Sequence, residues 1–173
     1  MVVYLIGLSG SGKTTLGNKL KSYLDHVGRP CYLMDGDLIR QFFDGDLGYS
    51  AEERRAHIKR ILLAAYVLSE NNVTTIVCNI APFEDLRQFA RHKIPEYNQI
   101  YLKKDLEKCI SEDAKGLYQR CKNKQPLVGY DLCFEPPLQN DLVLETQHES
   151  VEESFARLLA FLQAKYPETF TWA

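Results

Sequence analysis

Residues 7–14 read GLSGSGKT and follow directly on the apolar run VVYLI of residues 2–6. The stretch fits the pattern G-x-x-x-x-G-K-[S/T] in full. Its glycines permit unusual backbone dihedral angles, and successive N–H groups in such a loop form a concave anion site at the positive end of a helix. We therefore predict a phosphate-binding loop for a nucleoside triphosphate, made by Gly7, Leu8, Ser9, Gly10, Ser11, Gly12, Lys13, Thr14 and Thr15.

Two side chains of the loop have expected roles. Lys13 is predicted to reach the β- and γ-phosphates, and the Thr14 hydroxyl to bind Mg²⁺. GTPases usually read guanine with an N-K-x-D element, and NKQP at residues 123–126 lacks the aspartate. The pattern alone does not separate ATPases, small-molecule kinases and regulatory proteins.

Composition narrows the class of protein. The chain has 173 residues, of which 45% are hydrophobic and 25% charged, with a net charge of -2. This balance is typical of one globular domain over residues 1–173, and it argues against nucleic-acid or membrane binding as the main function. Five scattered cysteines without metal-ligand spacing indicate reduced thiols and a cytoplasmic protein.

Short apolar runs alternate with helical patterns along the chain. The expected strands are 2–6, 31–34, 73–78, 99–102 and 142–144, and the expected helices are 13–27, 51–70, 84–93, 106–111 and 151–164. Two helix starts carry a capping box, Ser50 with Glu53 and Ser150 with Glu153. The alternation predicts an α/β fold, with a parallel sheet covered by helices on both faces. Residues 115–137 do not continue this alternation of strands and helices, and we interpret them as a basic flap followed by an ordered loop.

The end of the second strand, DGDLIR at residues 35–40, is expected at the ligand crevice. Asp35 is predicted to hold the water shell of the metal. Asp37 is predicted to accept or orient the proton of an attacking hydroxyl.

Arg40 and Arg54 are predicted to grip an anionic nucleotide, with Tyr49 as a surface for its base. His57 shares a helix face with Arg54 and is a further candidate, although simple packing accounts for it equally well.

The motifs taken together resemble the adenylylsulfate kinases, which phosphorylate the 3′-hydroxyl of adenosine 5′-phosphosulfate with Mg-ATP. The resemblance runs in order through GLSGSGKTTL, DGDLIR, DLGYSAEERRAHI, NIAPF, CISEDAKGLY, VGYDLCFEPP and DLVLET. It implies a P-loop kinase fold with a five-stranded parallel sheet and a mobile lid over about residues 112–137. The cofactors it implies are ATP and Mg²⁺, the partners are nucleotides, and a homodimer is possible.

By position, the resemblance makes Asp37 the residue that orients the acceptor hydroxyl. Asp37 and the phosphate-contacting Lys13 are the two expected catalytic residues. The implied acceptor-binding residues are Asp37, Arg40, Tyr49, Arg54, His57, Ile80, Lys115 and Leu127, and the implied metal-binding residues are Thr14 and Asp35.

Several positions depart from the family pattern. Ala81 replaces a serine that some members phosphorylate, Glu84 reverses a positive charge, and Glu112 replaces an arginine that helps to hold ATP. Tyr49 and Leu127 replace the two phenylalanines around the adenine, and His57 replaces an asparagine.

Because these changes gather around the acceptor base, a cytidine diphosphoramidate kinase of bacterial capsule biosynthesis is an alternative to an adenylylsulfate kinase of sulfate assimilation. A nucleotide-dependent regulatory protein without transfer activity is a third interpretation.

Overall fold

The computed structural model describes residues 1–113, 116, 118, 128–129 and 132–170. Five parallel strands form one sheet in the order β2-β3-β1-β4-β5. They are β1 (Val2–Ile6), β2 (Cys31–Asp35), β3 (Thr74–Cys78), β4 (Tyr97–Lys103) and β5 (Leu142–Glu145). The predicted α/β class with a five-stranded parallel sheet is confirmed.

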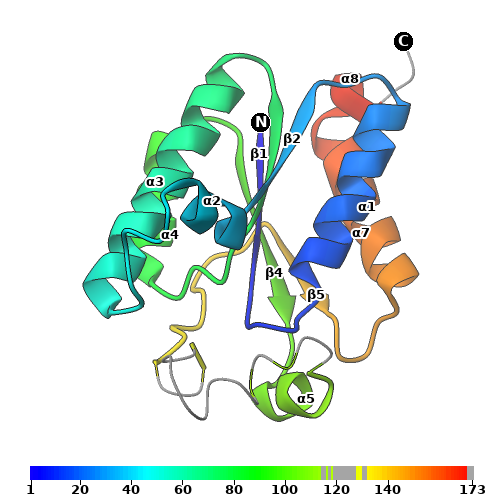
Figure 1. Cartoon of the computed structure of the whole chain (residues 1–173). Coiled ribbons are helices and arrows are strands. Elements are labelled where there is room, and N and C mark those ends of the chain that lie inside the picture. The colour runs from blue at the N-terminus through cyan, green and yellow to red at the C-terminus, as the bar shows by residue number, and fades with distance from the viewer. Residues whose placement is uncertain (114–115, 117, 119–127, 130–131, 171–173) are drawn as a thin grey trace.

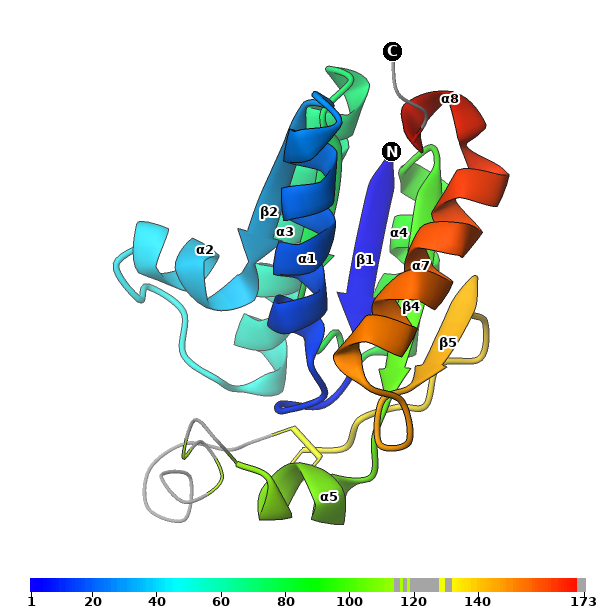
Figure 2. The ribbon, with the colours of Figure 1, turned by 90° about the vertical axis from the view of Figure 1, so that its right-hand side faces the viewer.

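Helices cover both faces of the sheet (Figures 1 and 2). One face carries α1 (Lys13–His26), α7 (Val151–Lys165) and α8 (Pro167–Phe170), and the other carries α3 (Ala51–Glu70) and α4 (Glu84–Lys93). The short α2 (Gly36–Phe42) projects from the end of β2, and α5 (Leu106–Ser111) follows β4 at the carboxyl edge.

Strand β1 shows why the central strands are apolar throughout. Its side chains alternate between faces, so Tyr4 and Ile6 pack with α3 and α4, whereas Val3 and Leu5 pack with α1 and α7. Every residue of β1 is buried. A continuous apolar run is therefore required, because neither face meets water.

The capping boxes at the starts of α3 and α7 are both present, as predicted. Helix α2 was not among the expected helix ranges, and none of its residues is buried. Strand β4 begins at Tyr97, two residues before the predicted start, because buried Tyr97 and Asn98 also pair with β1. Among the described residues, no helix is long and apolar enough to cross a membrane.

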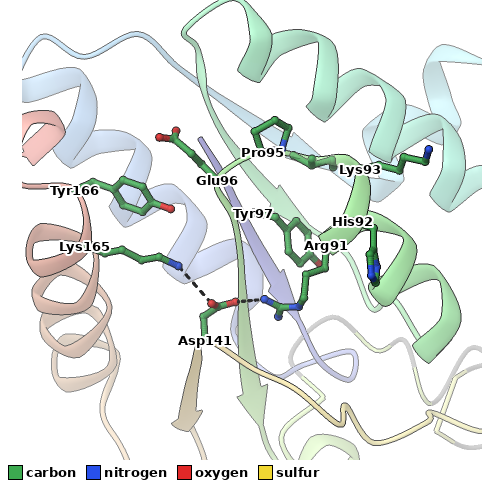
Figure 3. A pocket seen from close by; sticks show the side chains of 10 residues that line it. Arg91, His92, Lys93, Pro95, Glu96, Tyr97, Asp141, Lys165 and Tyr166 are labelled. Atoms are coloured by element: carbon green, nitrogen blue, oxygen red, sulfur yellow. Dashed lines mark hydrogen bonds and ion pairs between the residues drawn. The ribbon is translucent and has the colours of Figure 1, made fainter.

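A cavity of about 460 Å³ lies at the amino-terminal edge of the sheet, opposite the edge where β1 meets residues 7–14 (Figure 3). Asp141 accepts hydrogen bonds there from Arg91 at 3.0 Å and from the Gln99 N–H at 2.9 Å, and it lies 3.4 Å from the Lys165 ammonium. Burial alone would raise the pKa of Asp141, but the Gln99 and Arg91 bonds hold it below its ordinary value. These charges join α4, β4 and α7, and we assign them a structural role.

Candidate active site

The loop between β1 and α1 has the geometry of an anion site. Gly7, Gly10 and Gly12 have φ angles of 143°, 80° and 96°, which favour glycine. A Cβ on Gly7 would lie 2.5 Å from the carbonyl oxygen of Leu102, so no side chain fits there. The first turn of α1 contains no acidic residue, which keeps the positive end of the helix uncompensated.

Lys13 folds back over the start of this loop. Its ammonium donates hydrogen bonds to the carbonyls of Gly7, at 2.9 Å, and Leu8, at 2.7 Å. The Ser11 N–H donates to the Leu8 carbonyl at 3.2 Å and closes the turn. The cation therefore lies at the mouth of the loop, beside the backbone groups predicted to bind phosphate.

Asp35 joins the loop to the second strand. Its Oδ2 accepts a hydrogen bond from the Thr14 hydroxyl at 3.1 Å. Its Oδ1 accepts from the Asp37 N–H at 2.9 Å, which caps the N-terminus of α2. The two residues predicted to bind the metal are thus in direct contact.

Asp37 and Arg40 lie one turn apart on α2, and the Asp37 side chain is exposed. Arg40 donates from Nη1 to the carbonyls of Leu47, at 3.0 Å, and Gly48, at 2.9 Å. These bonds hold the connection between α2 and α3 against α2. They also fix the direction of one guanidinium at the predicted acceptor site.

Tyr49 lies close to two guanidinium groups. The Arg40 Cζ is 4.6 Å and the Arg54 Cζ 5.1 Å from the centre of its ring. Arg54 also donates from Nε to the Tyr49 carbonyl at 2.9 Å. The structure therefore brings the three residues together as predicted, with the arginines oriented by backbone and by the aromatic ring.

His57 is buried, and its Nε2 lies 2.9 Å from the carbonyl oxygen of Gly36. Burial, assisted by the nearby Arg40 charge, lowers the pKa of His57 to about 4. The ring is therefore neutral at pH 7 and donates its Nε2 proton to this acceptor. It joins α3 to the residue before Asp37, while direct contact with an acceptor stays a prediction.

Ile80 lies two residues after the end of β3 beside the phosphate-binding loop, and its carbonyl accepts from the Gly7 N–H at 3.5 Å. Lys115 and Leu127, also predicted to bind the acceptor, lie outside the described residues, as does most of the predicted lid. Tyr118, the last residue of the KGLY motif, is buried and donates from its hydroxyl to the Ser9 carbonyl at 2.9 Å. Sequence reasoning had not predicted that contact.

Comparison with known proteins decides the family. The sequence profile of adenylylsulphate kinase matches residues 1–145. The chain belongs to the adenylylsulphate kinase family.

Two curated relatives and one solved structure illustrate the similarity. The chain is 35% identical to the adenylyl-sulfate kinase of Halothermothrix orenii, over 95% of this chain and 90% of the relative. It is 34% identical to the adenylyl-sulfate kinase of Bacillus pumilus, over 95% of this chain and 85% of the relative. The structure of the Mycobacterium tuberculosis APS kinase CysC in complex with AMPPNP and APS matches with a TM-score of 0.86 and 28% identity, over 94% and 96% of the two chains. The predicted P-loop kinase fold is thereby confirmed.

One departure from the family pattern, Glu84, has a local explanation. Glu84 lies in the first turn of α4 and accepts hydrogen bonds from Arg87 at 2.9 and 2.6 Å and from Gln88 at 2.6 Å. Burial would raise the pKa of Glu84, but the Gln88 and Arg87 bonds lower it below its ordinary value. The carboxylate neutralises the Arg87 guanidinium, which is only 2% exposed.

The same arginine fixes the backbone after β3. Arg87 donates to the Ala81 carbonyl at 2.5 Å and to the Glu135 carbonyl at 2.7 Å. Ala81 has a φ of 49°, rare for a residue with a side chain, and its N–H donates to Asn79 Oδ1 at 2.9 Å. Arg87 and Glu84 thus hold the backbone next to Ile80. Arg87 was not predicted from the sequence, because its burial and its contact with Glu135 depend on a segment far along the chain.

We predict that Glu84→Arg, which restores the sign of charge usual in the family, destabilises this chain. Two guanidinium groups would then meet without the carboxylate between them, and we expect a loss of about 2–4 kcal/mol in unfolding free energy. Urea denaturation measures it. Glu84→Gln keeps an acceptor for Arg87 and is the matched control, expected to lose about half as much. Equal stability of the Glu84→Arg variant and the parent would contradict this reading.

His57 gives a prediction about pH. Its pKa is about 4 in the folded chain, below the ordinary value of 6.5. The unfolded chain therefore binds more protons between these values, and the contribution of His57 to stability is complete above pH 6.5 and falls towards pH 4. As the pH falls from 6.5 to 4, the unfolding free energy of the parent should decrease by up to roughly 3 kcal/mol more than that of His57→Gln. Unfolding free energies measured for both proteins at several pH values test this, and parallel pH profiles would contradict it.

Proposed function

We propose that this chain, as an adenylyl-sulfate kinase, transfers the terminal phosphoryl group of ATP to the 3′-hydroxyl of adenosine 5′-phosphosulfate. The observation that carries the proposal is the contact between Thr14 and Asp35, at 3.1 Å. It joins the phosphate-binding loop to the start of α2, which bears Asp37 and Arg40. A donor site and a predicted acceptor site therefore meet at one edge of the sheet.

ATP is proposed to lie with its phosphates against the N–H groups of residues 7–15. Lys13 would exchange its bonds to the Gly7 and Leu8 carbonyls for the β- and γ-phosphates, since a phosphate is a stronger partner for an ammonium than a neutral carbonyl. Arg40 and Arg54 would hold the anionic groups of the acceptor. The 7–15 loop and the two arginines thus place both substrates before any bond changes.

Magnesium fits the residues at the mouth of the loop. The Thr14 hydroxyl and the Asp35 carboxylate are hard oxygen donors, the ligand type that Mg²⁺ takes in company with substrate phosphates. No group of three or more His, Cys, Asp or Glu side chains suited to a metal occurs in the part of the chain that the structure describes. When bound, the ion would neutralise phosphate charge, with Thr14 as a ligand and Asp35 acting through water.

Asp37 is proposed to accept a hydrogen bond from the 3′-hydroxyl and then its proton. As the 3′-oxygen bonds to the γ-phosphorus, the bond from that phosphorus to the β,γ-bridging oxygen breaks and ADP leaves. His57 is proposed to position Asp37 without contacting the acceptor, because its hydrogen bond to the Gly36 carbonyl fixes the residue before Asp37. Chemistry of this kind depends mainly on alignment and charge neutralisation.

The acceptor base is tested by a panel of nucleotides. We expect ATP-dependent 3′-phosphorylation of adenosine 5′-phosphosulfate with kcat/KM at least about tenfold above that for cytidine diphosphoramidate. Product analysis with each acceptor, and with none, measures it. A preference for the cytidine nucleotide would establish the alternative acceptor, and ATP binding without any transfer would establish a regulatory protein.

We predict that Asp37→Asn lowers kcat by about a hundredfold or more while the Kd for ATP changes less than about threefold. The amide cannot accept the hydroxyl proton, yet it leaves the phosphate-binding loop intact. Asp44→Asn is the matched control, since Asp44 is exposed and its φ of 52° suits asparagine equally well. If turnover of Asp37→Asn stays within a few-fold of the parent, Asp37 does not orient the acceptor.

A further inference from the structure

The outer side of the phosphate-binding loop is supported by the segment from the end of β4 through α5. The Lys104 ammonium lies 3.5 Å from the carbonyl oxygen of Gly10. The Cα of the same glycine faces α5, because an added Cβ would lie 3.6 Å from the Cys109 carbonyl oxygen. Two adjacent loop carbonyls are thus contacted from one side, Gly10 by Lys104 and Ser9 by Tyr118.

Lys104 is unusual among the lysines of this segment. Its side chain is 9% exposed, whereas those of Lys103 and Lys108 are 48% and 49% exposed. The Lys104 ammonium lies 2.5 Å from Glu112 Oε2, and Lys108 contacts the other oxygen of Glu112 at 3.0 Å. A largely buried cation is therefore paired with one carboxylate and directed at the phosphate-binding loop.

Glu112 also connects to the second support. The next residue, Asp113, accepts a hydrogen bond from the Tyr118 N–H at 2.7 Å, and Tyr118 holds the Ser9 carbonyl. Both supports of the loop are therefore held by acidic residues at the C-terminal end of α5, Lys104 by Glu112 and Tyr118 by Asp113. In a phosphate-binding loop the N–H groups turn inward when the carbonyls turn outward, so holding the carbonyls orients the donors.

We propose that Lys104 is a positioning residue of the ATP site: paired with Glu112, it holds the Gly10 peptide so that the loop N–H groups face the phosphates. At 3.5 Å the contact is long for a hydrogen bond, so it acts mainly through the attraction between the ammonium and the carbonyl dipole. In this proposal Lys104 acts on the phosphates only through the loop backbone. This inference rests on the proposed function for the identity of the donor nucleotide, but not for the acceptor.

The test is calorimetric binding of ATP to Lys104→Met, which keeps the length of the side chain and removes the charge. We expect the Kd for ATP to rise about tenfold. The KM for the acceptor should stay within about twofold, and Lys104→Arg should recover most of the affinity.

Two neighbouring lysines are matched controls. Lys108→Met removes a partner of the same Glu112, and Lys103→Met removes a lysine that pairs with Glu145 at 2.9 Å. Each should change the Kd for ATP less than about twofold. A Lys104→Met variant that binds ATP as these controls do would overturn the proposal. So would an equal loss of ATP and acceptor affinity with a lowered melting temperature, because that pattern marks general destabilisation.

A double-mutant cycle tests the pairing with Glu112. Glu112→Gln should weaken ATP binding in the parent but have little further effect in Lys104→Met, because the charge it orients is gone. Additive effects would remove Glu112 from the proposal. Since ATP binding is measured without an acceptor, the inference on Lys104 can succeed even where phosphorylation of adenosine 5′-phosphosulfate fails, and the two failures are distinguishable.

Discussion

Asp35 carries two bonds on which the arrangement of the active site depends. One carboxylate oxygen caps α2, and the other accepts from Thr14 in the first turn of α1. In the sheet, β2 and β1 are separated by β3, so this contact spans the strand between them. The helix with the proposed acceptor-orienting residue and the helix with the proposed phosphate-binding lysine are thereby held together, whichever nucleotide is the acceptor.

Two of the departures from the family pattern, Glu84 and Glu112, are explained by the cation with which each carboxylate pairs. Glu84 pairs with the buried Arg87, and Glu112 pairs with the largely buried Lys104. A buried charge without a partner is strongly unfavourable, so the buried Arg87 and the largely buried Lys104 each require a nearby carboxylate. Neither acidic residue by itself indicates a lost activity, because each belongs to a network that supports the backbone of the site.

The sequence was most informative where structure is local. The five strands, the phosphate-binding loop and both capping boxes follow from short patterns. Helix α2 is absent from the expected helix ranges because its seven residues are too few to show a clear helical period. Contacts such as Arg87 with Glu135 depend on residues far apart in the chain, which no local period reveals. The roles of Lys115 and Leu127 stay predictions carried by the resemblance alone.

The chemistry of His57 follows from the charges around it. Arg40 and Arg54 flank Tyr49, and Arg60 is held by Asp46, so the proposed acceptor site gathers several guanidinium groups. A protonated His57 would be repelled by these guanidinium groups, whereas the neutral imidazole can donate one hydrogen bond to the Gly36 carbonyl without adding charge. Burial and the neighbouring Arg40 keep the ring in that neutral form. The positive charge of the proposed acceptor site therefore comes from the arginines, which suits an anionic nucleotide. The hydrogen bond from His57 that fixes the start of α2 is made by a neutral ring.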